Sequence, residues 1–429
     1  MAILNKIGYG YNDLTIIPAM TSKVNSRKDV NVFYDDGNLP IFVSPMSTII
    51  NMKNFHLWES NNLIPILPRN IDFEIRKDYI MQGKWVALSL DEFEDLFINN
   101  DDMLESVSVK PHILIDVANG HMSRLGNICR AAKKMWGNNL VLMCGNIANP
   151  RTYTLVSEAG VDYVRCSVGS GSCCTTSSNT GIHYPIASLI DEINNIKNER
   201  KKSGDFYSKV IADGGIRNFN DVIKALALGA DYVMIGGLFN TILESAAEPI
   251  DGDDVLFNNS MYKQHIDNIL SYYPNIDLNN KLVIRGDFGY EEKINTYMEK
   301  YSNIDGLNIV ISKCKNIDLY QGYGVFDVYN ENLPENIKRY LIGHNIKKET
   351  YGMSTKYAQS LIKNTKDLKT SEGCYKIVEV KYTMKQWVDN MKDYLRSAMS
   401  YCNSFNLLEF IGNQNLIINS PSEIYSVNK

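Results

Sequence analysis

Residues 112–146 read HILIDVANGHMSRLGNICRAAKKMWGNNLVLMCGN. This stretch begins with an apolar, β-branched run, continues with an amphipathic helical pattern over residues 122–135, and ends with a second apolar run over residues 140–144. A strand-like run, a helix and another strand-like run are typical of two parallel strands joined by a crossover helix. The polar residues after each run predict loops at the ends of these strands.

The same unit recurs along the first 250 residues. Further helical patterns cover residues 150–159 and 218–228, and Pro150 suits the first turn of its helix. In all, eight apolar runs alternate with helical stretches, at residues 40–43, 63–67, 85–90, 112–116, 140–144, 162–166, 209–213 and 231–236. Eight such units predict an α/β protein with a closed (β/α)8 TIM barrel, whose active site lies on the loops after the strands. An open, doubly wound sheet is the alternative.

The repeat stops near residue 250. Residues 251–349 carry strand-like runs at 282–284, 307–311 and 325–328, and a helix-like run at 290–301. We therefore predict that residues 1–250 and 350–429 form the barrel domain, and that 251–349 form an inserted small α/β subdomain of unassigned role. The chain then ends in a helix near residues 385–399.

Composition excludes several classes of protein. The formal net charge of -5 over 429 residues includes no basic stripe, so we expect no nucleic-acid partner. The start of the chain does not have the pattern of a signal peptide and no long apolar run spans a bilayer, which predicts a cytoplasmic protein with no membrane partner. The 8 cysteines are dilute and form no C-x-x-C pair, which indicates reduced, mostly buried thiols.

Unusual residues follow several predicted strands. Residues 169–176 read GSGSCCTT, where glycines allow a ligand to approach the backbone and a thiol can attack an electrophilic carbon. A buried, inert cysteine is the alternative. Asp213-Gly214-Gly215 and Gly236-Gly237 follow the seventh and eighth runs, where barrels hold phosphate on backbone N–H groups and an aspartate can bind ribose hydroxyls. Simple turns and a helix cap are the alternatives for these residues.

Residues 168–185, VGSGSCCTTSSNTGIHYP, resemble the catalytic loop of the IMP dehydrogenase and GMP reductase family. The resemblance covers most of the chain outside the insertion. It implies that Cys174, and not Cys173, is the nucleophile, that Thr176 assists it, and that Ser172 contacts substrate. It also implies a monovalent-cation site, with K⁺ as the candidate, on the backbone carbonyls of Gly169, Gly171 and Cys174.

The resemblance assigns further residues to ligands. Those that it implies for the substrate are Asp213, Gly214 and Gly215 at the ribose, Gly236 and Gly237 at the phosphate, and Tyr351, Gly352, Met353 and Ser354 at the phosphate and purine. Those that it implies for the nicotinamide cofactor are Asp116, Asn119, Gly120, Gly145 and Asn146.

The chain departs from the family pattern at four serines. Ser167 and Ser170 replace a glycine and a proline of the loop, Ser177 replaces an arginine, and Ser47 replaces an aspartate. The resemblance implies that the replaced residues contribute to cofactor affinity and to the rigidity of the loop. The nucleophile, Cys174, is unchanged.

The choice between the two reactions depends on the segment after residue 354. Dehydrogenases of the family carry an Arg-Tyr pair there, whereas residues 355–370 contain no arginine. Ser371-Glu372-Gly373 instead resembles the reductases, which implies that Glu372 works with Thr176 to move the proton that ammonia needs. The run from Asp116 to Gly120 also favours a reductase, whereas Ser44-Pro45-Met46 is slightly more typical of a dehydrogenase.

The resemblance therefore predicts a GMP reductase-like enzyme. It would convert GMP to IMP by NADPH-dependent reductive deamination through a covalent Cys174 adduct at purine C2, with NADH as the alternative donor. An IMP dehydrogenase using NAD is the second hypothesis, and a nucleotide-binding regulator without turnover is the third. The family also implies a homotetramer.

Overall fold

The structure is a computed structural model of the chain. It describes residues 6–100, 108–171, 174–247, 249–250, 282–288, 307–313, 320–326, 328–343, 346–362, 370, 373–421 and 423–424. The chain divides into two compact units: Met1–Phe239 with Tyr351–Tyr375 and Val388–Lys429, and Asn240–Thr350 with Lys376–Trp387. The second unit begins earlier than the expected insertion and includes a later segment of the chain. No helix among the described residues is long and apolar enough to cross a membrane.

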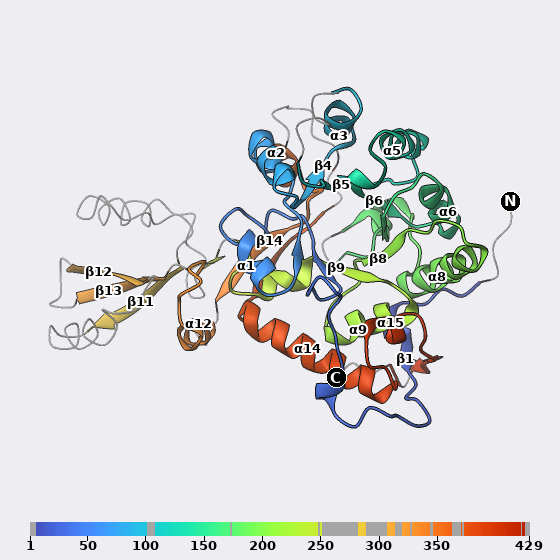
Figure 1. Ribbon diagram of the computed structural model, residues 1–429. Coiled ribbons are helices and arrows are strands. Elements are labelled where there is room, and N and C mark those ends of the chain that lie inside the picture. The colour runs from blue at the N-terminus through green and yellow to red at the C-terminus, as the bar shows by residue number, and fades with distance from the viewer. Residues whose placement is uncertain are drawn as a thin grey trace. The chain divides into compact units, whose positions relative to one another are not determined.

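The first unit contains a closed barrel of eight parallel strands, which confirms the predicted fold class (Figure 1). Neighbouring strands follow the order β3-β2-β9-β8-β7-β6-β5-β4, and a parallel bridge between Leu67 and Val86 closes the ring between β3 and β4. The strands are β2 (Ile41–Val43), β3 (Ile64–Pro65), β4 (Trp85–Leu88), β5 (His112–Asp116), β6 (Val141–Ile147), β7 (Tyr163–Cys166), β8 (Lys209–Asp213) and β9 (Tyr232–Ile235).

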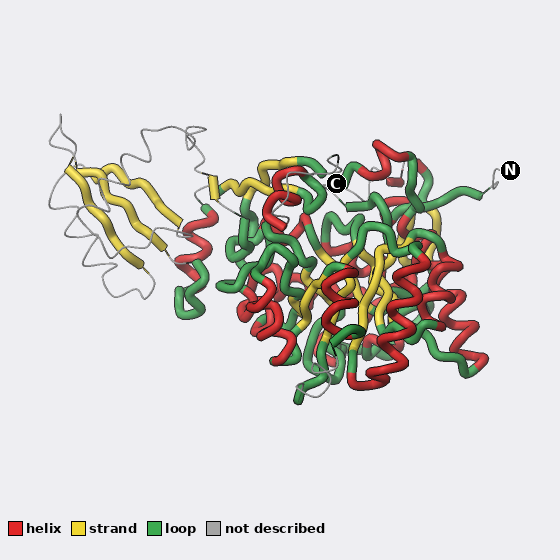
Figure 2. Tube along the Cα trace, turned by 90° about the horizontal axis from the view of Figure 1, so that it is seen from above, coloured by secondary structure: helices red, strands yellow, loops and turns green. Residues whose placement is uncertain are grey.

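Helices surround these strands (Figure 2). They are α1 (Phe55–Ser60), α2 (Phe73–Met81), α3 (Leu90–Phe97), α5 (Ser123–Trp136), α6 (Pro150–Glu158), α8 (Ile186–Ser203) and α9 (Phe219–Leu228), with the short α7 (Thr176–Thr180) in the loop after β7. In α5, the buried residues Leu125, Ile128, Ala132 and Trp136 recur at helical spacing, so that they form one apolar face. The Asn149 side chain caps α6 by accepting a hydrogen bond from Arg151 N, and Pro150 occupies the first turn.

Several strand boundaries differ from the predicted ones, and the difference at the end of β6 bears on the site. β6 runs to Ile147, so Gly145 and Asn146 belong to the strand and not to the loop expected after residue 144. Gly145 pairs with Asp116 of β5, and the pairing of β6 with β7 shifts register between Cys144 and Ile147. The backbone at Gly145 has φ +147, and a Cβ there would lie 2.6 Å from Arg165 Cβ. Only glycine therefore lets β7 approach so closely.

The barrel interior is apolar and aromatic at the amino ends of the strands. Phe42, Trp85, Tyr163 and Tyr232 contact one another there, with the Phe42 and Trp85 ring centroids 5.4 Å apart. Each buried ring of this kind stabilises the fold by roughly 2–3 kcal/mol through removal of apolar surface from water. This packing leaves the carboxyl ends of the strands for a ligand.

The second unit contains two small sheets. β11 (Leu282–Phe288), β13 (Tyr320–Phe326) and β12 (Leu307–Lys313) form an antiparallel sheet in that order, which overlaps all three strand-like runs of the expected insertion. A second sheet joins β10 (Pro249–Ile250), β14 (Lys347–Tyr351) and β15 (Tyr375–Glu379). The helix-like run at residues 290–301 lies outside the described residues.

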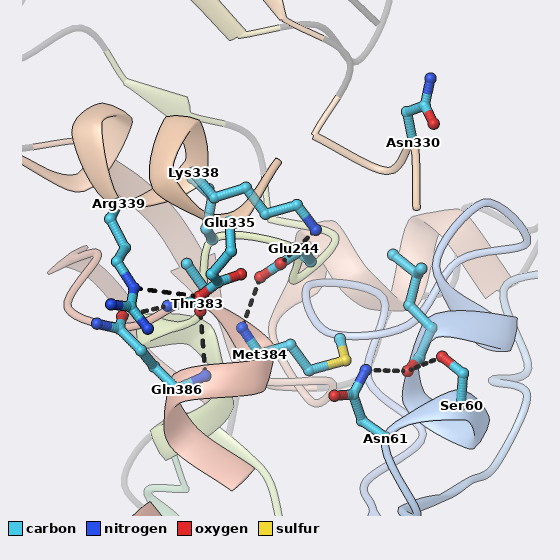
Figure 3. A network of polar contacts seen from close by, with 12 residues as sticks. Ser60, Asn61, Glu244, Asn330, Glu335, Lys338, Arg339, Thr383, Met384 and Gln386 are labelled. Carbon is cyan, nitrogen blue, oxygen red and sulfur yellow. Dashed lines mark hydrogen bonds and ion pairs between the residues drawn. The ribbon is translucent and has the colours of Figure 1, made fainter. Parts of the chain in front are cut away.

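A buried ion pair anchors the helix α12 (Glu335–Ile342) of this unit (Figure 3). Lys338 Nζ lies 3.0 Å from Glu244 Oε1, and Glu244 Oε2 accepts a hydrogen bond of 2.8 Å from Met384 N. Glu244 is 2% exposed, so its charge depends on these partners. Met384 begins α14 (Met384–Tyr401), which the sequence predicted near residues 385–399.

Remaining elements lie at the chain ends. β1 (Leu14–Ile16) follows the short helix η1 (Tyr11–Asp13) and pairs antiparallel with β16 (Leu416–Ile418). α13 (Lys356–Ile362) and α15 (Leu407–Phe410) complete the helices of the first unit. These elements position no residue of the predicted site except through the segment that precedes α13.

Candidate functional site

A cavity of about 350 Å³ lies at the carboxyl ends of the barrel strands. Of the predicted site residues, it brings together Asp116, Asn146, Gly171, Cys174, Asp213, Gly214, Gly215, Gly236, Gly237, Gly352, Met353 and Ser354. Ser44, Pro45, Met46, Arg69 and Arg165 also line it. The residues come from loops far apart in the sequence, as expected for a site built on a barrel rim.

Cys174 lies on this rim with its thiol beside a hydroxyl. The Cys174 Sγ–Thr176 Oγ1 distance is 3.2 Å, and Thr176 begins α7. A backbone hydrogen bond of 3.0 Å from Cys174 N to Gly171 O closes the turn that carries the thiol. Cys174 also forms an antiparallel bridge with Gly373, which brings the segment just after Glu372 to the loop. A thiol held beside a hydroxyl in a cavity suits nucleophilic chemistry.

The described cysteines differ in access to solvent. Cys129, Cys144, Cys166 and Cys402 are buried, whereas Cys174 and Cys374 are partly exposed. Burial raises the pKa of the Cys166 thiol above its ordinary value, so that residue is inert at neutral pH. Of the cysteines that the structure describes, Cys174 alone lines the cavity.

A polar cluster crosses the cavity floor from β5 to β8. Arg165 of β7 donates from Nη1 to Asp116 Oδ1 at 2.7 Å and from Nη2 to Asp213 Oδ2 at 2.9 Å. Asn146 of β6 donates from Nδ2 to the same Asp213 oxygen at 2.6 Å. Burial alone would lower the pKa of the Arg165 guanidinium, but the carboxylates of Asp213 and Asp116 raise it above its ordinary value. Arg165 therefore stays charged.

Sequence reasoning missed Arg165 and Arg69. The strand containing Arg165 was recognised, but its charged residue was not assigned to the site. Arg69 follows β3 and donates from Nη1 to Asp116 O at 3.2 Å. Two arginines therefore contact Asp116, one at its carboxylate and one at its carbonyl.

The glycine loops fit closely around the cavity. Gly214 has φ +94, and a Cβ there would lie 3.2 Å from Gly171 N. Gly215 N donates to Ser170 O at 3.0 Å, which ties the loop after β8 to the loop that carries Cys174. Gly236 faces Met46, and a Cβ added at Gly236 would lie 3.1 Å from the Met46 sulfur. These loops leave backbone accessible to a ligand, as glycine pairs in phosphate loops do.

The segment 351–354 reaches the same rim. Gly352, Met353 and Ser354 line the cavity, and Tyr351 lies beside it. Ser47 Oγ donates to Tyr351 Oη at 3.1 Å and contacts Met353 Sδ at 3.5 Å. The serine at position 47 thus fixes this segment next to the loop after β2.

The other residues predicted for the cofactor lie around Asn146 and outside the cavity lining. Gly120 N donates to Asn146 O at 2.8 Å. Asn119 Oδ1 accepts a hydrogen bond of 3.1 Å from His121 N. His121 in turn accepts at Nε2 from Ala148 N at 3.0 Å, so Nδ1 carries the hydrogen toward Thr152 Oγ1, also at 3.0 Å. His121, which the sequence did not single out, connects the loops after β5 and β6.

The carbonyls predicted to hold a monovalent cation already accept hydrogen bonds within the loop. Gly169 O accepts from Ser177 Oγ at 3.2 Å, and Gly171 O accepts from Cys174 N at 3.0 Å. Among the described residues, no cluster of His, Cys, Asp or Glu side chains suits a metal ion. No chemical step is therefore assigned to a cation. Ser172 and Glu372 lie outside the described residues.

Comparison with known proteins agrees with this arrangement. Residues 94–266 match the model of the IMP dehydrogenase / GMP reductase domain. The chain is 27% identical over 274 residues to the GMP reductase of Mycoplasma mycoides, covering 62% of this chain and 80% of that protein. It is 27% identical over 275 residues to the GMP reductase of Staphylococcus epidermidis (62% and 79% covered), and 29% identical over 261 residues to that of Bacillus cereus (58% and 75%). Over residues 94–266 this barrel protein is therefore similar to the IMP dehydrogenase / GMP reductase domain.

Proposed function

We propose that this chain is a GMP reductase that converts GMP to IMP with NADPH as hydride donor. The observation that carries the proposal is the Cys174 thiol, 3.2 Å from the Thr176 hydroxyl, in a cavity that Asp213 and the glycine loops also line. The similarity to GMP reductases of several bacteria supports this choice of reaction.

The proposed reaction is GMP + NADPH + H⁺ giving IMP + NADP⁺ + NH₃. The Cys174 thiol passes its proton toward Thr176, and its sulfur attacks C2 of the purine. The bond between C2 and the exocyclic amino nitrogen then breaks, and ammonia leaves with the proton that Thr176 and Glu372 deliver. When bound, the nicotinamide supplies a hydride to C2. The C2–S bond breaks as IMP forms, and the thiolate is regenerated.

The residues proposed for the nicotinamide lie close to the nucleophile. Asp116 and Asn146 line the same cavity as Cys174, and the loops that contain Asn119 and Gly120 pack against Asn146. A nicotinamide ring placed against these residues would face a purine that is held by Asp213 and by Gly236 and Gly237. Their roles are to orient the two rings and to exclude water from the hydride path.

The test compares two assays of the purified protein. Loss of the reduced-nicotinamide absorbance with GMP plus NADPH supports the proposal, and NADH in place of NADPH tests the alternative donor. Appearance of that absorbance with IMP plus NAD would instead show an IMP dehydrogenase, which the Ser44-Pro45-Met46 loop slightly favours. If neither assay gives turnover, absence of a covalent purine adduct at Cys174 by mass spectrometry would indicate a nucleotide-binding regulator.

Three further proposals concern the insertion, the assembly and a cation. We propose that residues 251–349 serve regulation or subunit contact. We also propose that the protein forms a homotetramer and that K⁺ binds the loop of residues 169–174. Sedimentation of the full chain and the dependence of turnover on K⁺ test the last two proposals.

A further inference from the structure

Arg165 occupies an unusual position for a charged residue. It lies on β7 inside the barrel and is 7% exposed. Its guanidinium reaches Asp116 of β5 on one side and Asp213 of β8 on the other. Gly145 permits this placement, since a Cβ there would lie 2.6 Å from both Cβ and the carbonyl oxygen of Arg165.

The contacts of Arg165 divide the two oxygens of Asp213 between different tasks. Asp213 Oδ2 accepts from Arg165 Nε at 3.2 Å, from Arg165 Nη2 at 2.9 Å and from Asn146 Nδ2 at 2.6 Å. Among the described residues, Asp213 Oδ1 accepts no hydrogen bond in the structure. Asp213 lines the cavity, so Oδ1 is the oxygen left to accept hydrogen bonds from a ligand.

Arg165 also holds the two carboxylates in one arrangement, since its guanidinium lies 2.7 Å from Asp116 Oδ1 and 2.9 Å from Asp213 Oδ2. A planar guanidinium can contact groups on both sides at once, which a lysine ammonium on a flexible stem does less well. Arg165 thus fixes the orientation of both carboxylates.

The other ionisable groups near this cluster do not replace Arg165. Tyr11 and Cys166 are buried, and burial raises the pKa of both, so neither changes charge near neutral pH. Cys144 of β6 is also buried. Arg69 contacts the Asp116 carbonyl, and Cys174 lines the cavity.

We propose that Arg165 is a positioning residue that holds Asp213 in one orientation, so that Asp213 Oδ1 accepts hydrogen bonds from the ribose hydroxyls of the nucleotide. The proposal rests on the proposed function, because it takes the ligand to be a purine nucleotide. In this role Arg165 acts through Asp213 and does not contact the reacting atoms. Loss of Arg165 should therefore lower the affinity for the ribose hydroxyls.

The test measures dissociation constants of GMP and of its 2′,3′-dideoxy analogue by calorimetry, for the wild type and for Arg165→Met and Arg165→Lys. In the wild type, GMP should bind more tightly than the analogue by at least about tenfold, as expected for hydrogen bonds to a charged group. In Arg165→Met, GMP should bind about tenfold to hundredfold more weakly, and the preference over the analogue should nearly disappear. Arg165→Lys should retain part of the preference.

Arg76→Met is the matched control. Arg76 is 3% exposed and pairs with Glu92 Oε1 at 2.6 Å, but it does not line the cavity. Its loss should lower the melting temperature and leave the preference for GMP over the dideoxy analogue unchanged. A wild-type preference that persists in Arg165→Met would overturn the proposal. If Arg165→Met does not fold, a full sugar preference in Arg165→Lys would overturn the proposal. Failure of the wild type to bind either nucleotide would refute the proposed function instead.

Discussion

The contact between Cys174 and Thr176 predicts a specific kinetic defect. Thr176→Val keeps the size and branching of the side chain and removes the hydroxyl that lies 3.2 Å from Cys174 Sγ. Positioned proton transfer contributes about 10²–10⁴-fold to a rate. Because Cys174 can still lose its proton to water, we expect the lower end: kcat falls about 10²-fold, which is about 2.7 kcal/mol in the barrier.

The assay is GMP-dependent oxidation of NADPH, with the dissociation constant of GMP measured separately. The dissociation constant should change by less than about twofold, since the hydroxyl contacts the thiol and not the phosphate loops. Thr176→Ser, which keeps a hydroxyl, is the control and should retain most of the activity. A kcat for Thr176→Val within about threefold of wild type would refute the assignment of Thr176 to proton transfer.

Four other changes test separate parts of the interpretation. Cys174→Ala should abolish turnover while GMP still binds, as measured by calorimetry; residual turnover would exclude Cys174 as nucleophile. Glu372→Gln should lower kcat with little change in KM, and an unchanged kcat would remove Glu372 from the proton path. Lys338→Met should destabilise the second unit by about 3–5 kcal/mol, because it leaves Glu244 buried without its cation, and faster hydrogen exchange in α12 would report this. Replacing residues 252–327 by a flexible linker, which keeps Lys338 beside Glu244, should preserve folding and basal catalysis, whereas loss of soluble protein would show that the fold requires the removed segment.

The barrel could be predicted because its strands are short, β-branched runs with distinct ends. The predicted bounds of β5 and β8 coincide with those observed, His112–Asp116 and Lys209–Asp213, since each apolar run ends at an aspartate. β6 was different, because Gly145 and Asn146 have the composition of a turn. Their place in the strand depends on the close approach of Arg165, and single-sequence patterns do not contain that contact.

The cavity residues that follow strand ends were predictable, and the charged residue within a strand was missed. A signal for Arg165 was nevertheless present. Tyr163 packs in the barrel interior, and Arg165 is two positions further along the same strand, so both side chains face inward. An inward arginine requires acidic partners, and Asp116 and Asp213 end strands on either side of β7. Combining strand parity with charge would have brought the three residues together.

The serines that depart from the family pattern explain how the site keeps its form without the usual residues. Ser177 Oγ donates to Gly169 O, which holds the loop closed at its base. Ser170 accepts at its carbonyl from Gly215 N, a backbone contact that does not depend on the side chain at position 170. Ser47 donates to Tyr351 Oη and so fixes the segment that carries Met353. Because each contact is a hydrogen bond between neutral groups, the departures alter what stabilises the rim and leave the nucleophile and the carboxylates that line the cavity in place.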